Sequence, residues 1–411
     1  MKPRKFCWPD GHWDWYQHLA FKHGVKAGEL IFVGGQVDKT DKGEPLNAFD
    51  LQSQTAKVVG HIGTVLAGFD ASLADVTKLV AFYVNDGSVD EQTFIADVGR
   101  RFLEGVEKPI VHGPAITAVP LPCLALPGMM VEIEAIAMPS KDTGTLARCG
   151  VNPDALPLLP QPFTHGLRAG QHTWISAQSP RDSSGHIACA GDPVAQSTVI
   201  MENIETVLRA LDLEHEDIVK VGCWFDGDGT TNTWKPGAIA RSAHFQRPGP
   251  VVTELPSPCL PNGESARLEA WAMRGESGEK LSRQWKSSEA WQWPLRLAYS
   301  HGLRCEDFVF LSAHLPLDHD GQTNKRGDLN DQTRQVMTDI DTTLRSFGLD
   351  LNHMVKQTSF FLGKADPEDI VTNQTLRSSY YTEPAGASTG VPMPYLTLDG
   401  VMVSVDTIAM L

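Results

Sequence analysis

The sequence predicts an α+β protein built from three copies of one unit, and two observations lead to this prediction. The first is an apolar strand that ends in small residues and one polar residue, found at residues 31–36 (IFVGGQ), 174–178 (WISAQ) and 310–314 (FLSAH). The second is a shared register, because Gln54, Gln196 and Gln332 are 142 and 136 positions apart and so are Lys78, Lys220 and Lys356. Such regular spacing indicates repeated supersecondary units that bury their apolar faces against one another.

The elements of one unit can be predicted in order from the first copy. Apolar residues at spacings of three and four predict an amphipathic helix with one face on a sheet, and they are Val58, Ile62, Val65 and Leu66. The other expected elements are a strand at 29–33, a turn at 38–43, a strand at 80–84, a helix at 91–103 and strands at 117–121 and 130–138. This order predicts one sheet with helices on one face, and the other face buried against the sister units.

Composition along the chain predicts the domain boundaries. Residues 1–140 are expected to form unit 1, with a Trp-rich N-terminal extension, residues 163–275 unit 2, and residues 295–411 unit 3. The segments between them, 141–162 and 276–294, are rich in proline or in charged and serine residues and are predicted to be linkers.

Tryptophans precede two of the three units in register. Trp13 and Trp15 correspond to Trp291 and Trp293, whereas unit 2 has Ala155 and Pro157 at these positions. We expect the tryptophans to be apolar straps over a neighbouring unit, with a ligand-facing role as the alternative.

Overall composition excludes several classes of protein. A net charge of -15 without a basic cluster argues against nucleic-acid binding, and no apolar run is long enough to span a membrane. Seven scattered cysteines and the absence of a signal peptide indicate a cytoplasmic protein with reduced thiols. Neither metal-ligand spacing nor a Gly-rich phosphate loop is found, so no metal and no cofactor are expected.

Several of these motifs resemble the RidA (YjgF-type) family. They are the Gly-Gly-Gln or Ser-Ala-Gln strand end, the Gln54-Thr55 pair and the VEIEAIA run at 131–137. The resemblance implies a chorismate-mutase-like unit and a pseudo-trimer made from one polypeptide, with strands inside and helices outside. It also implies small-molecule clefts between neighbouring units and hydrolysis of reactive imines or enamines with release of ammonia. We therefore expect a monomer with pseudo-threefold symmetry, or a weak homodimer.

One residue of the family pattern is missing from all three copies. The arginine that binds the substrate carboxylate in the deaminase members is replaced by Ile116, Val252 and Ser388. A bidentate carboxylate clamp needs a guanidinium, so this difference argues against the usual amino-acid-derived enamine as substrate.

Other cleft positions are retained. The family's aromatic residue corresponds to Phe21, Phe163 and Tyr299, and a histidine follows two positions later at His23, His165 and His301. Residues two apart on a strand share a face, so we expect each histidine to point where its aromatic neighbour points. A histidine of this kind can move a proton during hydrolysis, or it can simply hydrogen-bond a backbone carbonyl.

The family's water-orienting glutamate matches Glu132, with Arg267 and Ser404 as its counterparts. Glu132 is a candidate general acid or base, or an ion-paired strand residue. Arg267 would invert the charge of its cleft and favour an anionic substrate. The following acidic positions, Glu134, Glu269 and Asp406, are expected at the interface between units.

The remaining candidates come from the strand ends and from one later position. The strand ends supply Gly34, Gln36, Ser176, Gln178, Ser312 and His314 as expected substrate-binding residues. Cys123 and Cys259 are candidate nucleophiles that need a nearby base, or else core residues, and Tyr395 takes their place in unit 3 as a substrate-binding candidate.

Three functions remain open on this evidence. The first is a hydrolase of a small nitrogen-containing metabolite, acting on an imine, enamine or related C–N bond. The second is a ring-opening amidohydrolase of the pseudo-trimeric type, although its repeated Ser-Lys pairs are not found here. The third is a non-catalytic ligand-binding or scaffold protein. Fusion lets each cleft diverge separately, which favours an enzyme with one specialised site.

Overall fold

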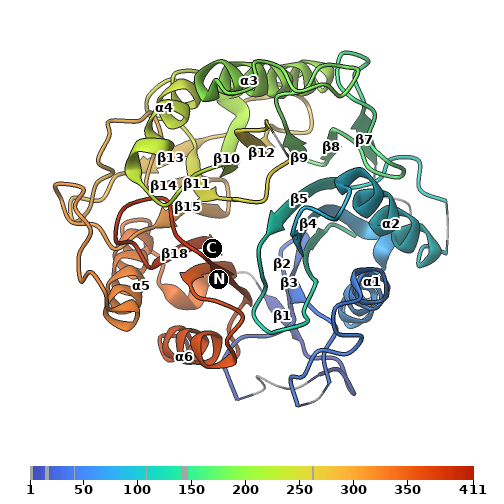
Figure 1. The fold of residues 1–411 in the computed structure, drawn as a ribbon, viewed down its shortest axis with the longest axis horizontal. Helices are drawn as coiled ribbons and strands as arrows, with labels where there is room; N and C mark the ends of the chain where they lie inside the picture. The colour runs from blue at the N-terminus through green and yellow to red at the C-terminus, as the bar shows by residue number, and fades with distance from the viewer. Residues whose placement is uncertain (1–2, 14–17, 41, 108, 140–146, 262) are drawn as a thin grey trace.

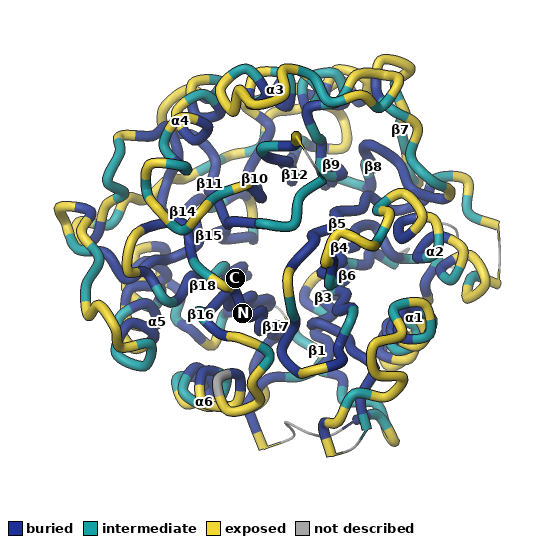
Figure 2. Tube along the Cα trace, viewed as in Figure 1, coloured by how far each residue is buried: buried dark blue, intermediate teal, exposed yellow. Residues whose placement is uncertain are grey.

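Three six-stranded sheets surround a common centre, with the helices at the periphery (Figure 1). The computed structural model describes residues 3–13, 18–40, 42–107, 109–139, 147–261 and 263–411. Strands and inner helix faces are buried, and the outer helix faces are exposed (Figure 2). The predicted α+β fold of three units in an intramolecular pseudo-trimer is thereby confirmed.

Unit 1 shows the plan that the other units repeat. Its elements are β1 (Arg4–Cys7), β2 (Gly24–Ala27), β3 (Leu30–Gln36), α1 (Leu51–Ala67), η1 (Leu73–Asp75), β4 (Val76–Val84), α2 (Glu91–Glu104), β5 (Ala115–Leu121) and β6 (Val131–Ala137). The sheet order is β1-β2-β3-β6-β4-β5, and β4 pairs with β5 in parallel while the other neighbours are antiparallel. The crossover between the parallel strands contains α2, as expected for such a connection.

Units 2 and 3 have the same sheet order. Unit 2 contains β7 (Arg148–Val151), β8 (Gly166–Ala169), β9 (His172–Gln178), α3 (Pro193–Ala210), η2 (His215–Asp217), β10 (Ile218–Phe225), α4 (Thr231–Ser242), β11 (Val251–Pro256) and β12 (Ala266–Met273). Unit 3 contains β13 (Arg283–Lys286), β14 (Gly302–Cys305), β15 (Phe308–His314), α5 (Leu329–Arg345), η3 (Leu351–His353), β16 (Met354–Leu362), α6 (Pro367–Ser378), β17 (Ala387–Met393) and β18 (Val403–Met410).

The first helix of each unit buries the predicted apolar face and begins at an aspartate cap. In α1, Val58, Ile62, Val65 and Leu66 are buried, and Asp50 accepts a hydrogen bond from the Ser53 N–H. The repeated glutamine explains part of the sequence register, because its amide joins this helix to the start of the unit's last strand. Its three copies Gln54, Gln196 and Gln332 accept from the N–H groups of Met130, Ser265 and Met402.

Each segment predicted as a linker contains a strand of the following unit. β7 lies within 141–162 and β13 within 276–294, and both form the edge of a sheet, as β1 does in unit 1. These edge strands carry an arginine that reaches the preceding unit. Arg283 donates to the carbonyls of Asp217 and Ile218, and Arg4 and Arg148 bind unit 3 and unit 1 in the same way. The proline-rich or charged and serine-rich composition of these segments hid the short strands. Units 2 and 3 therefore begin earlier than composition suggests.

The opposite edge of each sheet meets the next unit. β5 lies against β9, β11 against β15, and β17 against β3, so the three contacts close a ring. The Ile116 N–H donates to Ser176 Oγ and the Val252 N–H to Ser312 Oγ, both at 2.8 Å. In the third contact Gly34 replaces the serine, because a Cβ at this position would lie 2.8 Å from the Ser388 carbonyl oxygen.

Three ion pairs surround the pseudo-threefold axis, and each joins two units. Lys78 pairs with Glu269 at 2.6 Å, Lys220 pairs with Asp406 at 2.7 Å, and Lys356 pairs with Glu134. They line a small axial cavity of about 100 Å³. Three aromatic rings that occupy equivalent positions contact one another nearby, namely Phe82, Trp224 and Phe360. The acidic positions therefore lie at the interface, as their regularity suggested.

We expect Lys78→Met to lower the free energy of unfolding by about 3 kcal/mol, because Glu269 would keep a largely buried charge without its cation. The double variant Lys78→Met/Glu269→Leu should recover to within about 1 kcal/mol of the wild type. Urea unfolding measures both. Arg345→Met, at an exposed pair with Asp341, is the control and should leave stability unchanged. A double variant as unstable as the single one would show that the pair does not couple the units in this way.

Candidate functional site

The contacts between units form three seams, named here by the units that they join. Seam 1–2 lies between β5 and β9, seam 2–3 between β11 and β15, and seam 3–1 between β17 and β3. The three seams place equivalent residues at equivalent positions, so differences among them can be read directly from side chains.

Seam 1–2 contains a cavity of about 390 Å³. Unit 1 contributes residues of α2 and β5. Unit 2 contributes residues of β9 and β12 and its strap, which is the segment 157–159 before His165. The residues that line the cavity include Glu91, Ile116, Ala118, Pro157, His165, Ala177, Gln178, Arg181, Asn203 and Arg267. The cavity therefore gathers three of the predicted site residues, His165, Gln178 and Arg267.

His165 is a histidine that lines this cavity. Its ring is buried, and Nε2 lies 2.7 Å from the Pro157 carbonyl oxygen, which can only accept, so Nε2 carries the proton. Nδ1 is then the unprotonated nitrogen, and it has no hydrogen-bond partner among the described residues, with the Gln178 amide beside it. Burial lowers the pKa of His165. At neutral pH the ring is a neutral base.

Arg267 belongs to a chain of alternating charges at the same cavity. Its Nε donates to Glu264 at 2.7 Å, and its Nη1 donates to Glu91 at 2.7 Å and to the Ala118 carbonyl at 2.8 Å. Arg181 lies 3.3 Å from the other oxygen of Glu264. Burial alone would lower the pKa of Arg267, but the two carboxylates raise it. The positive charge is thus compensated, while Nη2 is buried without a partner among the described residues.

Seam 3–1 holds a tryptophan at the equivalent place. The Trp13 ring lies 4.4 Å from the ring of His23, the counterpart of His165. The Lys39 Nζ lies 5.8 Å from the centroid of the Trp13 ring, and Lys39 is the counterpart of Arg181. Trp13 is 5% exposed. The indole therefore contacts His23 and Lys39, the unit 1 counterparts of two residues that line the cavity in seam 1–2.

Seam 2–3 repeats this arrangement with Trp291. Its ring stacks on His301 at 3.9 Å and lies 5.0 Å from His314, the counterparts of His165 and Gln178. Trp291 is fully buried. Trp13, Trp291 and Trp293 each contact the histidine of their own unit, so packing over a neighbouring unit stays a prediction, and Trp15 lies outside the described residues.

The strap of unit 2 explains why its seam remains open. The carbonyl that accepts from the histidine belongs to Trp13 in unit 1 and to Pro157 in unit 2. Sequence register aligned Trp13 with Ala155 instead, because the strap of unit 2 reaches its histidine over a shorter path. A proline ring is much smaller than an indole, so space is left beside His165.

Glu132 lies in seam 3–1 and not at the open cavity. Its carboxyl is buried over Gly35, where a side chain would collide with it, and burial raises its pKa. Burial also lowers the pKa of Lys39, which faces it. The structure thus separates Glu132 from the cavity that His165 lines and places it beside Gly35 and Lys39.

Several predicted binding residues are engaged in hydrogen bonds within their own units. Ser176 Oγ donates to the Thr164 carbonyl, and His314 uses both ring nitrogens on Ser312 and Thr343. The Gln36 amide binds His12 and the Gly34 carbonyl. These contacts leave the residues little freedom to bind a ligand as well.

The predicted aromatic residues pack between units. They do not point in the same direction as their histidines, contrary to the prediction from the sequence. Phe163 lies in the core of unit 1, Phe21 contacts Tyr381 of unit 3, and Tyr299 contacts Phe245 of unit 2. The segment before each histidine is not regular strand, so the alternation assumed from the sequence does not apply there.

The candidate nucleophiles lie away from the cavity. Burial raises the pKa of Cys123 and of Cys259, so both thiols remain protonated at neutral pH. Tyr395 donates its hydroxyl to the Gly227 carbonyl of unit 2. All three follow equivalent edge strands, and we find no sign of catalytic activation in their surroundings.

The sequence alone did not single out Glu91, Arg181 or Glu264. Glu91 was expected only as the start of a helix, and Arg181 falls in a turn whose composition looks like solvated surface. Their signal becomes visible only when the units are superposed, because Arg181 occupies the place of Lys39.

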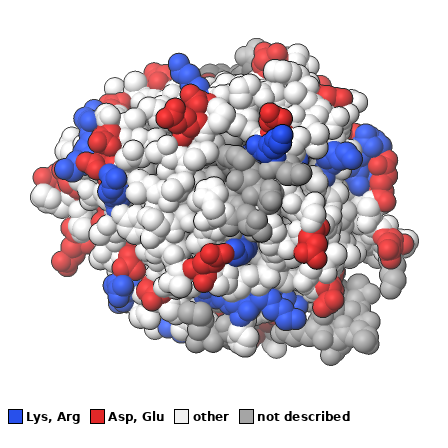
Figure 3. Space-filling model, turned by 90° about the horizontal axis from the view of Figure 1, so that it is seen from below, with Lys and Arg blue, Asp and Glu red and all other residues white. Residues whose placement is uncertain are grey.

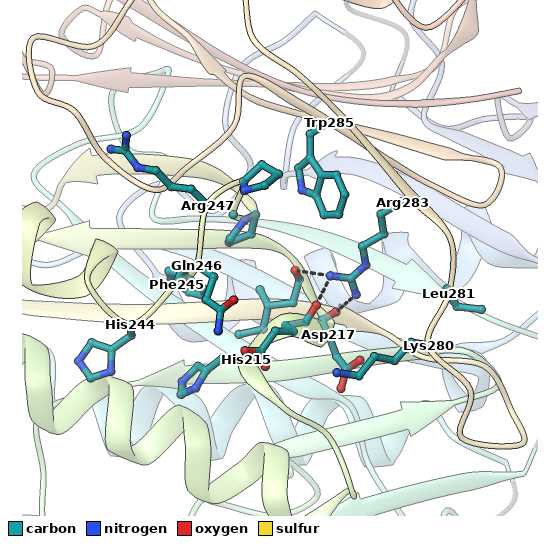
Figure 4. Close-up of a pocket in the computed structure, with 15 residues that line it drawn as sticks. His215, Asp217, His244, Phe245, Gln246, Arg247, Lys280, Leu281, Arg283 and Trp285 are labelled. Atoms are coloured by element: carbon teal, nitrogen blue, oxygen red, sulfur yellow. Dashed lines mark hydrogen bonds between the residues drawn. The ribbon is translucent and has the colours of Figure 1, made fainter.

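A second cavity, of about 380 Å³, lies between η2, the segment 244–250 and the edge strand β13 (Figure 4). Its walls carry Arg247, Arg283, His215 and His244. Arg247 and Arg283 both donate to backbone carbonyls of neighbouring segments. Arg283 is the arginine of edge strand β13 that reaches unit 2. We therefore take seam 1–2, which holds the predicted residues, as the candidate active site.

Three wider observations concern the part of the chain that the structure describes. Within the described residues no group of three or more His, Cys, Asp or Glu side chains is placed to hold a metal ion. On the face shown in Figure 3, acidic and basic side chains are interspersed. None of the helices that the structure describes is long and apolar enough to cross a bilayer.

Comparison with known proteins agrees with this architecture. The family model described as Endoribonuclease L-PSP matches residues 16–139 and 294–411, which fall on units 1 and 3. A RutC family protein of Pyrococcus horikoshii is 29% identical over 111 residues, covering 27% of this chain and 85% of that protein. Protein DfrA of Myxococcus xanthus is 32% identical over 135 residues, covering 31% and 97%. The structure of a chorismatase covers 82% of this chain and 93% of its own, with a TM-score of 0.50 and 14% identity.

The fold places the protein in the class of pseudo-trimers built from chorismate-mutase-like units, here with unequal seams. Because the two matched segments make up more than half of the chain, the protein belongs to the Endoribonuclease L-PSP family, the RidA or YjgF-type family. The chorismatase likeness concerns the fold alone.

The buried histidines predict a pH-dependent stability. Burial lowers the pKa of His314 to about 4, so between about pH 6.5 and 4 the unfolded chain binds a proton there that the folded chain does not. Stability is then lost as the pH falls through this range. His314→Gln introduces the residue found in units 1 and 2, and it should reduce the loss in unfolding free energy between pH 7 and pH 5 by about 2 kcal/mol.

Urea unfolding at the two pH values measures this change. The exposed His319→Gln serves as control and should keep the wild-type pH dependence. An unchanged pH dependence in His314→Gln would contradict the assignment of His314 as a buried neutral ring.

Proposed function

We propose that the protein is a hydrolase of a small nitrogen-containing metabolite and that the reaction takes place in seam 1–2. The proposed substrate has an imine, enamine or related C–N bond. The observation that supports this most directly is the cavity beside His165 in seam 1–2, together with the tryptophans that occupy the equivalent places in the other two seams. A cavity of about 390 Å³ suits a small molecule rather than an RNA strand.

The proposed chemistry needs a proton acceptor and polar groups that bind the substrate. His165 Nδ1 takes a proton from water as the oxygen attacks the carbon of the C=N bond. The protonated ring returns this proton to the nitrogen, which gives a carbinolamine. As the C–N bond breaks, the ring carries the remaining hydroxyl proton to the leaving nitrogen in the same way, so that the imine and water give a carbonyl compound and ammonia. The Pro157 carbonyl holds the Nε2–H, which leaves Nδ1 as the basic nitrogen.

The polar walls supply binding. The Gln178 amide lies beside His165, and Arg267 Nη2, which has no partner among the described residues, offers a further donor. Because Glu91 and Glu264 compensate the charge of Arg267, these donors suit a polar neutral or weakly anionic group. RidA-type members hydrolyse enamines and imines, and this resemblance supports the reaction class.

We expect His165→Gln to reduce ammonia release from imines, enamines or cyclic amides by about 10²- to 10⁴-fold, because the proton acceptor is lost. The matched controls are His23→Gln and His301→Gln, the same residue in the two seams that hold a tryptophan. Each should keep activity per folded molecule close to wild type. Equal loss in all three variants, or in none, would contradict the assignment to seam 1–2. Binding without turnover by the wild type would favour a ligand-binding protein.

The activity should also depend on pH with a fixed sign. Protonation of Nδ1 removes the base, so kcat/KM should fall on the acid side with a midpoint below about 6.5 and level off above it. A profile of kcat/KM between pH 4.5 and 8 measures this. A decline that starts above pH 7 would contradict a buried histidine as the base.

We expect Pro157→Trp to close the cavity, because it places an indole where Trp13 lies in unit 1. Activity should fall by about 100-fold or more through loss of substrate binding, while the folded state is retained. Turnover and near-ultraviolet circular dichroism measure the two effects. Lys235→Trp, on the exterior of α4, is the control for a new indole. Full activity of Pro157→Trp would show that the reaction takes place elsewhere.

A further inference from the structure

Arg377 of α6 is fully buried and has no ion pair among the described residues. Its Nε donates to Asn373 Oδ1 at 2.9 Å, and its Nη1 donates to Gln357 Oε1 at 2.9 Å and to Ser388 Oγ at 3.0 Å. These acceptors are all neutral. Nη2 is buried and has no partner among the described residues. The Phe21 ring of unit 1 covers the guanidinium at 5.4 Å.

Unit 2 shows the same arginine with a counter-ion. Arg241 lies at the equivalent place in α4, and its Nη2 pairs with Glu254 of β11 at 3.1 Å. Both side chains are buried. The position of Glu254 in unit 3 is Gly390 of β17, because β11 and β17 are aligned at the same offset as the two arginines. Unit 3 thus keeps the buried cation and lacks its carboxylate.

A buried guanidinium without an anion is unfavourable, because hydrogen bonds to neutral amides replace only part of its hydration. The contrast between the units appears in their pKa values. Burial lowers the pKa of Arg377 to about 10, whereas Glu254 is among the groups that outweigh burial and raise the pKa of Arg241. The ring of Phe21 offsets the cost in part. The arrangement is complete only if an anion joins it.

The surroundings of Gly390 offer a place for such an anion. A Cβ at Gly390 would lie 3.7 Å from Arg377 Nη2 and make only ordinary contacts with its other neighbours. Ser388 and Gly390 correspond to Ile116 and Ala118, two residues that line the open cavity of seam 1–2. The same place is therefore ligand space in one seam and lies beside an unpaired cation in another.

We propose that Arg377 binds a small monovalent anion, either chloride or a carboxylate group, beside Gly390 in seam 3–1. The anion would take the place of the Glu254 carboxylate in unit 2 and accept hydrogen bonds from Nη2. This site is independent of the reaction proposed for seam 1–2.

Thermal unfolding at constant ionic strength tests the proposal. Sodium gluconate, whose anion is too bulky for the site, is replaced stepwise by sodium chloride or by sodium formate. In the wild type we expect Tm to rise by about 2 °C and to saturate, because a ligand that binds only the folded state stabilises it. Saturation with chloride identifies an inorganic ion, and saturation with formate alone identifies a carboxylate.

Two variants make the test specific. Gly390→Glu supplies the carboxylate that unit 2 has, and it should abolish the response to both anions while keeping Tm at or above the wild-type value in gluconate. Arg377→Met removes the charge and should also abolish the response. Arg345→Met, on the exterior of α5, is the control and should respond as the wild type does. If one variant fails to fold, the other decides. A wild type without response, or a Gly390→Glu variant that responds as the wild type does, overturns the proposal.

Discussion

Closure of the ring depends on three ion pairs that lie around the axis and join neighbouring units. Each lysine comes from the fourth strand of one unit and each carboxylate from the last strand of the next. Because both partners are largely buried, each unit leaves a charge uncompensated unless its neighbour is in place. The sheets therefore fit together in one arrangement, and the positions of the seams follow from it.

Fusion of three units into one chain removes the requirement that the seams be equal, and the structure shows three different outcomes. Seam 1–2 holds a cavity, seam 2–3 is occupied by Trp291 stacked on a histidine, and seam 3–1 is occupied by Trp13. The histidine is present in every seam, so it does not by itself distinguish one seam from another. The residue beside it does, because Pro157 in unit 2 takes the place that Trp13 has in unit 1.

Buried arginines of units 2 and 3 are also compensated differently. Arg267 is compensated by Glu91 and Glu264, and Arg241 is compensated by Glu254. Arg377 has neutral partners only among the described residues. These differences follow from single positions, such as Glu254 and Gly390, while the backbone at these positions stays the same. A symmetric trimer would have to repeat each such change three times.

The sequence by itself determined the repeat, the order of elements and the family resemblance, because periodic apolar residues and repeated glutamines and lysines are local signals with a fixed spacing. It also named His165, Gln178 and Arg267, which line the candidate site. Only the tertiary structure showed that seam 1–2 holds a cavity, that Glu132 lies apart from His165, and that Pro157 rather than Ala155 takes the place of Trp13. The physical reason is that a cavity between units depends on side chains from segments far apart in the chain, and on strap lengths that sequence register does not reveal.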